Sequence, residues 1–291
     1  MTNPYFGRLL TAMVTPFDDK GVNVKAMGDH AQWLIEHGSD GLVVCGSTGE
    51  AATMTLSEKK AAVKAVLDRV GGKTKVIVGA GTNSTASTLE LVQEFSAMPI
   101  DGLLIVGPYY NKPTQEGYYQ HFAMVAKSTK LPIIVYNVPG RTASNIAPAT
   151  VARLAKDFSN IVAVKEAAGN VAQTAELFRL LPRDFTIYSG DDGLVLPFMS
   201  VGATGLISVL SNIGGEELQA IMQAYSAGRV REAAELNARL APKCQAMFVE
   251  TNPIPVKYAV TKVTGIDVGA PRLPLTPITT DAARKVDSAL N

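Results

Sequence analysis

Residues 161–170 read IVAVKEAAGN. In this stretch the apolar run from Ile161 to Val164 stops at Lys165, and Glu166 and small residues follow. A strand that ends in a single lysine can hold an amine at a fixed point in a dry environment. The ordinary pKa of lysine is near ~10.4, and desolvation or a nearby cation makes the neutral, nucleophilic amine more available. Taken alone, a lysine at such a place is more often a surface side chain just beyond a strand.

Apolar runs of this kind alternate with helical patterns along the chain, which predicts repeated strand–helix units. The predicted strands are Leu9–Val14, Gly41–Cys45, Lys75–Val78, Gly102–Val106, Pro132–Tyr136, Ile161–Lys165, Phe185–Ser189 and Gly205–Val209. Helical spacing covers Ala26–His37, Ser57–Val70, 84–98, 115–129, 148–157, 170–181, 191–200 and 215–227. A capping box, Thr55-x-x-Glu58, marks the start of the second of these helices.

The continuous apolarity of the strands indicates a sheet that is buried on both faces, and hence a parallel one. Eight sequential units predict an α/β fold, a (β/α)8 TIM barrel, with an open doubly wound sheet as the alternative. We therefore expect a catalytic barrel over 1–228 and a C-terminal helical region over 229–291. That region carries proline-rich turns at 252–257 and 272–277.

The composition excludes several classes of protein. The net charge of +1 and the lack of any Lys/Arg-rich block argue against a nucleic-acid-binding surface. Two cysteines without metal-ligand spacing fit a reducing compartment. Neither a signal peptide nor a membrane span is evident, so we expect a cytoplasmic protein.

Catalytic groups of such a barrel lie at the C-terminal ends of the strands and in the loops that follow. These positions hold GSTGE (46–50), GAGTNS (79–84), GPYYNKP (107–113), YNVPGRT (136–142), KEAAGN (165–170), SGDDG (189–193) and Ile207-Ser208. Lys165 is therefore expected to face a rim rich in glycine, hydroxyl groups and tyrosine, which favours a catalytic role.

Three of these segments suggest chemistry on a small acid. The backbone N–H groups of Ser47 and Thr48, between two glycines, could converge on a carboxylate, although glycine-rich turns before helices are common. Tyr136 ends a strand and could exchange protons beside Lys165, or it could only fill the barrel. Arg141 could bind a carboxylate at two points, or it could form an ordinary surface ion pair.

Other signals are weaker. Tyr109 and Tyr110 are adjacent in a loop and cannot easily both be buried in one subunit, so one of them is expected to reach a neighbouring chain. Asp191 and Asp192 are interpreted as caps of the following helix rather than as metal ligands. The histidines lie within helical patterns, so we expect no metal site, no catalytic triad and no organic cofactor.

Five motifs together carry a resemblance to a known family. GSTGE, PYYNKPTQEG, YNVPGRT, VKEAAGN and ETNPIPVK make the chain resemble the dihydrodipicolinate synthase family of pyruvate-dependent class I aldolases over nearly its whole length. The resemblance implies a barrel with a C-terminal helical domain, assembled as a homotetramer that is a dimer of dimers. It implies condensation of pyruvate with L-aspartate 4-semialdehyde, on the diaminopimelate route to lysine.

The resemblance also implies the catalytic residues. Lys165 would form a Schiff base with pyruvate, and Tyr136 would transfer protons beside it. Ser47 and Tyr110 would complete a hydroxyl relay with Tyr136, and Tyr110 would reach in from the partner subunit. Most members of the family carry threonine at the position of Ser47, so the hydroxyl is kept and only the methyl group is lost.

Four further positions are implied to bind substrate. Thr48 and the backbone of Ile207 would contact pyruvate, Arg141 would receive the carboxylate of the aldehyde substrate, and Gly190 would lie in the pocket wall. A sister enzyme such as N-acetylneuraminate lyase remains an alternative, because GSTGE occurs in both kinds of enzyme. A non-catalytic barrel that senses a small acid is the alternative from another class.

The resemblance further implies an effector cleft for lysine in some relatives. The corresponding positions are Ala51, Ala52, Lys59, Asn83, Ser87 and Tyr109. Regulated relatives carry a glutamate where this chain has Ser87 and a histidine where it has Lys59, whereas Asn83 and Tyr109 match. A missing carboxylate and an added cation predict weak or absent inhibition by lysine.

Overall fold

Eight short strands form a closed parallel barrel in a computed structural model, which describes residues 4–291. The strands are β1 (Leu9–Ala12), β4 (Gly41–Val44), β5 (Lys75–Gly79), β6 (Gly102–Val106), β7 (Ile133–Asn137), β8 (Ile161–Glu166), β9 (Thr186–Ser189) and β10 (Gly205–Ser208). Their order around the barrel is β1-β10-β9-β8-β7-β6-β5-β4. The predicted (β/α)8 barrel is confirmed, and an open sheet is excluded.

The chain divides into two compact units. The first comprises Met1–Arg8 and Ile77–Ile207, and the second comprises Leu9–Val76 and Ser208–Asn291. The boundary that we drew from the sequence between residues 228 and 229 stays a prediction. Among residues 4–291, no helix is long and apolar enough to cross a membrane.

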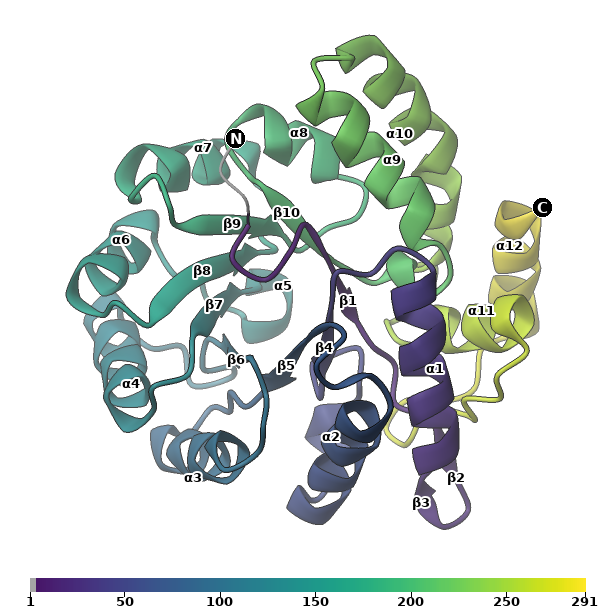
Figure 1. Cartoon of the computed structure of the whole chain (residues 1–291), viewed down its shortest axis with the longest axis horizontal. Coiled ribbons are helices and arrows are strands. Elements are labelled where there is room, and N and C mark those ends of the chain that lie inside the picture. The colour runs from purple at the N-terminus through teal and green to yellow at the C-terminus, as the bar shows by residue number, and fades with distance from the viewer. Residues whose placement is uncertain (1–3) are drawn as a thin grey trace. The chain divides into compact units, whose positions relative to one another are not determined.

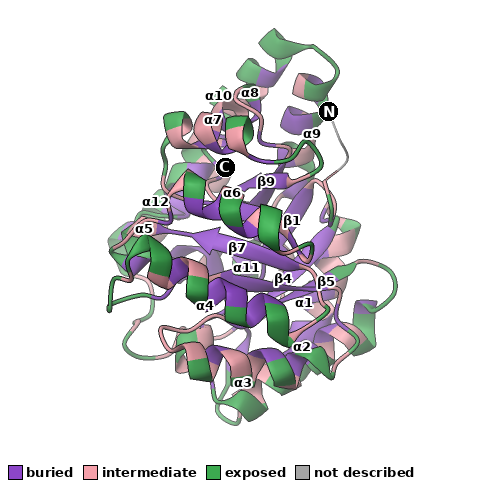
Figure 2. Cartoon of the chain, turned by 90° about the vertical axis from the view of Figure 1, so that its left-hand side faces the viewer, coloured by how far each residue is buried: buried purple, intermediate pink, exposed green. Residues whose placement is uncertain are grey.

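The helices of the first unit are α3 (Thr85–Ser96), α4 (Gln115–Ser128), α5 (Pro139–Thr142), α6 (Pro148–Asp157), α7 (Val171–Leu180) and α8 (Val195–Ser200). In this unit, α3, α4, α6 and α7 lie around the outside of the strands, whereas the short α5 follows the end of β7 (Figure 1). Figure 2 shows α4 buried along one side and exposed along the other, whereas the neighbouring β7 is buried throughout. Continuous burial explains why the strands read as unbroken apolar runs.

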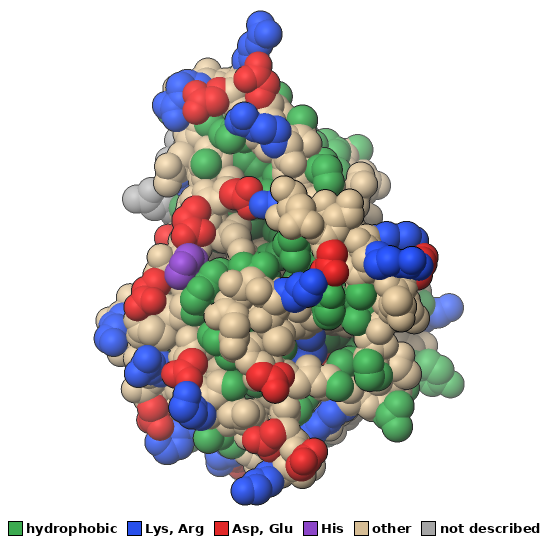
Figure 3. All heavy atoms as spheres, turned by 90° about the vertical axis from the view of Figure 1, so that its right-hand side faces the viewer, with side chains coloured by type: hydrophobic (Ala, Val, Ile, Leu, Met, Phe, Trp, Pro, Cys, Tyr) green, Lys and Arg blue, Asp and Glu red, His purple; other side chains and the backbone are tan. Residues whose placement is uncertain are grey.

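The second unit contains the remaining helices and a small hairpin. They are α1 (Val24–Glu36), α2 (Leu56–Val70), α9 (Gly215–Ser226), α10 (Val230–Ala246), α11 (Ile254–Thr264), α12 (Thr280–Leu290), the 3-10 turns η1 (Ala51–Thr53) and η2 (Leu210–Asn212), and the hairpin β2 (Phe17–Asp18) with β3 (Gly21–Val22). Figure 1 shows α9 and α10 side by side as a helical pair. Acidic and basic side chains are interspersed over the surface in Figure 3, as the net charge of +1 leads one to expect.

Two predictions about helix starts have opposite outcomes. The capping box at the start of α2 is confirmed, because Thr55 Oγ1 accepts from the Glu58 N–H and Glu58 Oε2 accepts from the Thr55 N–H. The prediction that Asp191 and Asp192 cap a helix is wrong. The helix begins only at Val195, and Asp191 Oδ1 accepts from the Gly193 N–H at 3.0 Å in the preceding turn.

Candidate active site

Lys165 and Tyr136 lie side by side at the C-terminal ends of β8 and β7. The parallel register pairs these two residues directly, and both are 6% exposed. Lys165 Nζ lies 4.4 Å from the centroid of the Tyr136 ring. The structure therefore brings together the amine and the phenol that the sequence placed at separate strand ends.

Gly190 packs closely against the side chain of Lys165. It directly follows β9, and its N–H donates to the Glu166 carbonyl oxygen at 2.7 Å. A Cβ atom at Gly190 would lie 3.1 Å from Lys165 Cε and 2.5 Å from Ala167 Cβ. Only glycine leaves room here for the lysine side chain. Ile207, another predicted contact, is fully buried in β10.

We expect Gly190→Ala to displace the Lys165 side chain, because overpacking of this kind forces neighbours off their rotamers. Covalent modification of the Lys165 amine should then be slower by roughly tenfold or more. The rate of covalent modification of Lys165 measures the effect. Gly193→Ala is the matched control, since a Cβ there would meet Asp191 Oδ1 at an ordinary 3.5 Å. Equal rates in the two variants would contradict this assignment.

Glu166 lies directly beyond Lys165 and is buried among neutral donors. The side chains of Asn137 and Gln173 and the Ala168 N–H all donate to its carboxylate, at distances from 2.7 to 3.2 Å. Burial raises the pKa of Glu166, and these hydrogen bonds oppose that rise. Sequence reasoning noted Glu166 only as the residue after Lys165.

Arg141 lies on α5, a single helical turn that begins directly after β7 and Val138. Pro139 occupies its first position, and the Arg141 N–H donates to the Val138 carbonyl oxygen at 2.9 Å. The fixed φ of proline favours such a helix start. Arg141 is exposed.

The loop before α4 exposes both of its tyrosines. Tyr109 is 37% exposed and Tyr110 is 87% exposed, and Tyr110 adopts a positive φ of 75°. The prediction that the pair is not buried within one subunit is confirmed. Asn111 Nδ2 donates to the Asn83 carbonyl oxygen at 2.7 Å, which ties this loop to the segment that leads into α3 and Ser87.

The GSTGE loop belongs to the second unit. Ser47 is exposed, whereas Thr48 is 3% and Glu50 is 5% exposed. The Thr48 hydroxyl oxygen accepts from Asn252 Nδ2 at 3.0 Å, and Thr15 Oγ1 donates to the Gly49 carbonyl oxygen at 2.7 Å. The loop is thus anchored from its side chain and from its backbone. The predicted effector positions Ala51 and Ala52 follow in η1, and Lys59 lies on α2.

A buried ion pair holds the end of this loop. Lys257 Nζ donates to Glu50 Oε1 at 2.9 Å and to the carbonyl oxygens of Thr15 and Ala270, while the Arg272 N–H donates to Glu50 Oε2. The two paired side chains are 2% and 1% exposed. In the sequence, this ion pair is indicated only by Lys257 at the end of the segment NPIPVK, and that position does not identify Glu50 as its partner.

Lys257→Met should lower the free energy of unfolding by about 3–5 kcal/mol, because it leaves the Glu50 carboxylate buried without its cation. Adding Glu50→Gln should recover part of the loss. Chemical denaturation measures both variants. Lys262→Met, which removes an exposed ion pair with Asp287, is the control and should have far less effect. Similar losses from the two lysine variants would count against this account.

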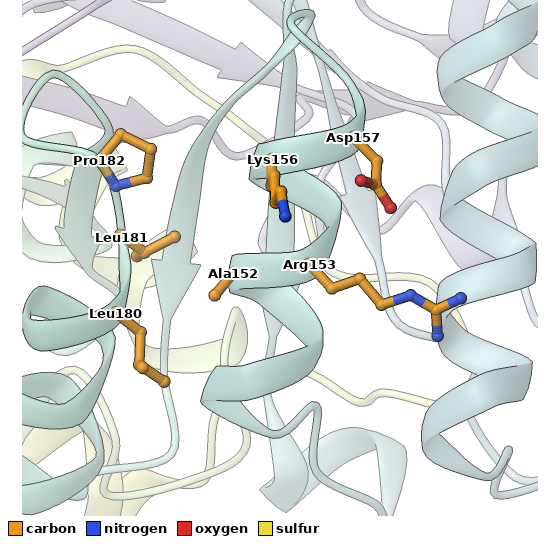
Figure 4. Close-up of a pocket in the computed structure, with 7 residues that line it drawn as sticks. All are labelled: Ala152, Arg153, Lys156, Asp157, Leu180, Leu181 and Pro182. Carbon is orange, nitrogen blue, oxygen red and sulfur yellow. The ribbon is translucent and has the colours of Figure 1, made fainter.

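Within residues 4–291, no three His, Cys, Asp or Glu side chains are grouped so as to hold a metal ion. A surface pocket on the first unit lies elsewhere, next to α6 and the end of α7 (Figure 4). Its lining consists of Ala152, Arg153, Lys156, Asp157, Leu180, Leu181 and Pro182. None of the predicted site residues contributes to it, so this pocket is not the candidate site.

Comparison with known proteins shows which proteins this chain is similar to. A 4-hydroxy-tetrahydrodipicolinate synthase of Desulforamulus reducens is 47% identical over 292 residues, which cover 100% of this chain and 98% of the relative. The crystal structure of the Cyanidioschyzon merolae dihydrodipicolinate synthase with lysine bound superposes with a TM-score of 0.96 at 42% identity, covering 99% of this chain and 98% of that one. A monomeric dihydrodipicolinate synthase variant superposes with a TM-score of 0.95 at 40% identity, covering 98% and 96%. The model of the dihydrodipicolinate synthetase family matches residues 5–291, and the chain belongs to that family.

Proposed function

We propose that this chain condenses pyruvate with L-aspartate 4-semialdehyde to form 4-hydroxy-tetrahydrodipicolinate, in lysine biosynthesis by the diaminopimelate pathway. The observation that carries the proposal is the buried amine of Lys165 beside the Tyr136 ring, in a chain of this family. A dry lysine at the end of a barrel strand is suited to attack a carbonyl carbon.

The reaction begins when the neutral Lys165 amine attacks the keto carbon of pyruvate. Loss of water from the resulting carbinolamine leaves an imine, which draws electrons from the adjacent methyl carbon. Loss of a proton from that carbon converts the imine into an enamine. The nucleophilic carbon of the enamine then bonds to the aldehyde carbon of the second substrate, while the aldehyde oxygen takes up a proton. The amino group of that substrate then attacks the imine carbon, closes the ring and releases the Lys165 amine.

Each step moves a proton near the imine, and this requirement supports a role for Tyr136. A phenol can both donate and accept, but its ordinary pKa near ~10 makes it a weak base by itself. We propose that Ser47 and Tyr110 complete a hydroxyl relay with Tyr136. The relay avoids leaving a charge in a dry place, because each hydroxyl passes on one proton as it receives another.

Substrate recognition rests on the remaining predicted residues. We propose that Thr48 and the Ile207 backbone bind pyruvate, that Arg141 receives the carboxylate of the aldehyde substrate, and that Gly190 forms part of the pocket wall. Because the imine itself serves as the electron sink, we propose no metal or organic cofactor.

Assembly is proposed from the exposed tyrosine loop. Tyr110 is 87% exposed although it is an aromatic residue of the proposed relay, which favours insertion into a partner subunit. We therefore propose that the chain forms oligomers and, from the family resemblance, that the assembly is a homotetramer, a dimer of dimers. We also propose that the protein is cytoplasmic. Sedimentation velocity of the wild-type chain measures the assembly.

Pyruvate and borohydride should yield a reduced covalent adduct at Lys165, because borohydride converts the imine into a stable amine. Peptide mapping by mass spectrometry locates the adduct. Lys165→Arg should abolish it, whereas Lys112→Arg, in the exposed loop before α4, should leave it unchanged. Folded wild-type protein that forms no adduct would refute the proposed chemistry.

The sister lyase reading is disfavoured by the exposed tyrosine pair and by Arg141 on α5, positions at which the sugar-acid lyases vary. Coupled assays with both substrate sets discriminate between the two enzymes. Cleavage of a sugar acid without condensation of pyruvate and the semialdehyde would reverse the assignment.

Lysine should inhibit this enzyme weakly or not at all, because Ser87 and Lys59 offer a hydroxyl and a cation to a cationic ligand. Steady-state rates at increasing lysine concentration test the prediction. The double variant Ser87→Glu/Lys59→His should bind lysine more tightly, whereas Ser96→Glu, at the other end of α3, should not. Half-maximal inhibition of the wild-type chain by sub-millimolar lysine would contradict it.

A further inference from the structure

The segment that carries Arg141 begins at Asn137, the last residue of β7, and its far end lies next to the side chain of the same residue. Between these points the chain forms α5, turns at Ala143 with a positive φ of 57°, and reaches Ile146. The Ile146 N–H donates to Asn137 Oδ1 at 3.0 Å. The buried amide side chain of Asn137, 1% exposed, therefore joins the two ends of this loop. Gln115 also holds the loop, because its Nε2 group donates to the Asn145 carbonyl oxygen at 2.8 Å.

The direction of that closing hydrogen bond depends on Glu166. A carboxylate only accepts, so Asn137 must turn its Nδ2 group toward Glu166, whose two oxygens lie 3.2 and 3.1 Å away. This orientation leaves Asn137 Oδ1 facing the Ile146 N–H. Reversing the amide would place a carbonyl oxygen against a carboxylate and an NH₂ group against an N–H.

Two further amides extend the same pattern. Asn137 Nδ2 also donates to Asn145 Oδ1 at 2.8 Å, and Gln173 Nε2 donates to Asn145 Oδ1 and to Glu166 Oε2. Asn145 Nδ2 donates in return to Gln173 Oε1 at 2.8 Å. The donors and acceptors of this cluster match one another, and a satisfied buried network of this kind fixes a single arrangement.

We propose that Glu166 and Asn137 are positioning residues that set the place of Arg141, and thereby the affinity for the carboxylate of the second substrate. The carboxylate of Glu166 orients the Asn137 amide, and that amide closes the Arg141 loop behind the Lys165–Tyr136 pair. This inference rests on the proposed function, in which Arg141 receives the aldehyde substrate.

Asn137→Asp tests the proposal because it sets two carboxylates against each other without changing the shape of the side chain. We expect KM for L-aspartate 4-semialdehyde to rise about tenfold, as for a buried polar group that loses its partners. KM for pyruvate and borohydride trapping at Lys165 should change much less, since the side chains of Lys165 and Tyr136 lie on the opposite face of these strand ends from Asn137 and Glu166.

The double variant Asn137→Asp/Glu166→Gln should restore most of the affinity for the aldehyde. It carries the same charge as the wild-type cluster, and half-turns of the Asn145 and Gln173 amides let the hydrogen bonds between side chains run in the opposite direction. The Ile146 and Ala168 N–H groups would still donate to positions 137 and 166. The new carboxylate at position 137 would then accept from the new amide at position 166, from Asn145 and from the Ile146 N–H. A role limited to stability would not predict recovery of KM for one substrate.

Asn160→Asp provides the matched control. Asn160 is a partly buried asparagine that donates to the carbonyl oxygens of Ala126 and Thr129, away from this loop. It should leave KM for the aldehyde unchanged even where it lowers the melting temperature. An Asn137→Asp variant that traps pyruvate and keeps the wild-type KM for the aldehyde would overturn this inference alone. Loss of trapping in the wild-type chain would instead overturn the proposed function.

Discussion

The parallel register between β7 and β8 is the constraint on which the site depends. It sets Tyr136 opposite Lys165 and, one residue further, Asn137 opposite Glu166. Successive side chains of a strand point to opposite faces, so the two pairs lie on opposite sides of the same two strand ends. In the proposed mechanism the first pair supplies the reactive groups, and the second pair holds the loop that carries Arg141. A slip of one residue between the two strands would separate both pairs.

The buried carboxylates of Glu50 and Glu166 are stabilised in different ways. Glu50 faces the cation of Lys257, whereas Glu166 is held by two amide side chains and a backbone N–H. Burial of a carboxylate is costly unless its oxygens are paired or hydrogen-bonded. At Glu166 neutral donors satisfy the carboxylate oxygens. At Glu50 the cation of Lys257 pairs with the carboxylate, which holds the end of the GSTGE loop.

Sequence patterns predicted the barrel because eight largely apolar runs alternate with segments of helical spacing. They also predicted Lys165 and Tyr136, since each interrupts an apolar run at its end. They did not predict the polar partners of the loops. Asn252 contacts Thr48, and Lys257 contacts Glu50, across 204 and 207 residues of sequence. No local periodicity encodes such pairs, because they depend on how the whole chain folds.

Local misreadings have a similar cause. Acidic residues before an apolar segment favour a helix cap, yet Asp191 satisfies the N–H of Gly193 within its own turn, and the helix starts further on. The hairpin of β2 and β3 was missed because each of its strands contains only two residues. Short elements carry too few side chains to establish a period, and backbone hydrogen bonds define them instead.

The position of each functional group on the fold separates shared chemistry from substrate choice. Lys165 and Tyr136, which form the imine and move protons in the proposed mechanism, lie at strand ends whose places the barrel fixes. Arg141 lies on the short helix α5, and Tyr110 lies in a loop. A barrel can therefore keep one covalent mechanism while its loops change the second substrate. Such a change requires loops that are individually anchored, since an unanchored arginine would lose affinity to conformational entropy. We propose that the Asn137–Glu166 hydrogen bonds contribute this anchoring for the loop that carries Arg141, on the face of the strands opposite to Lys165.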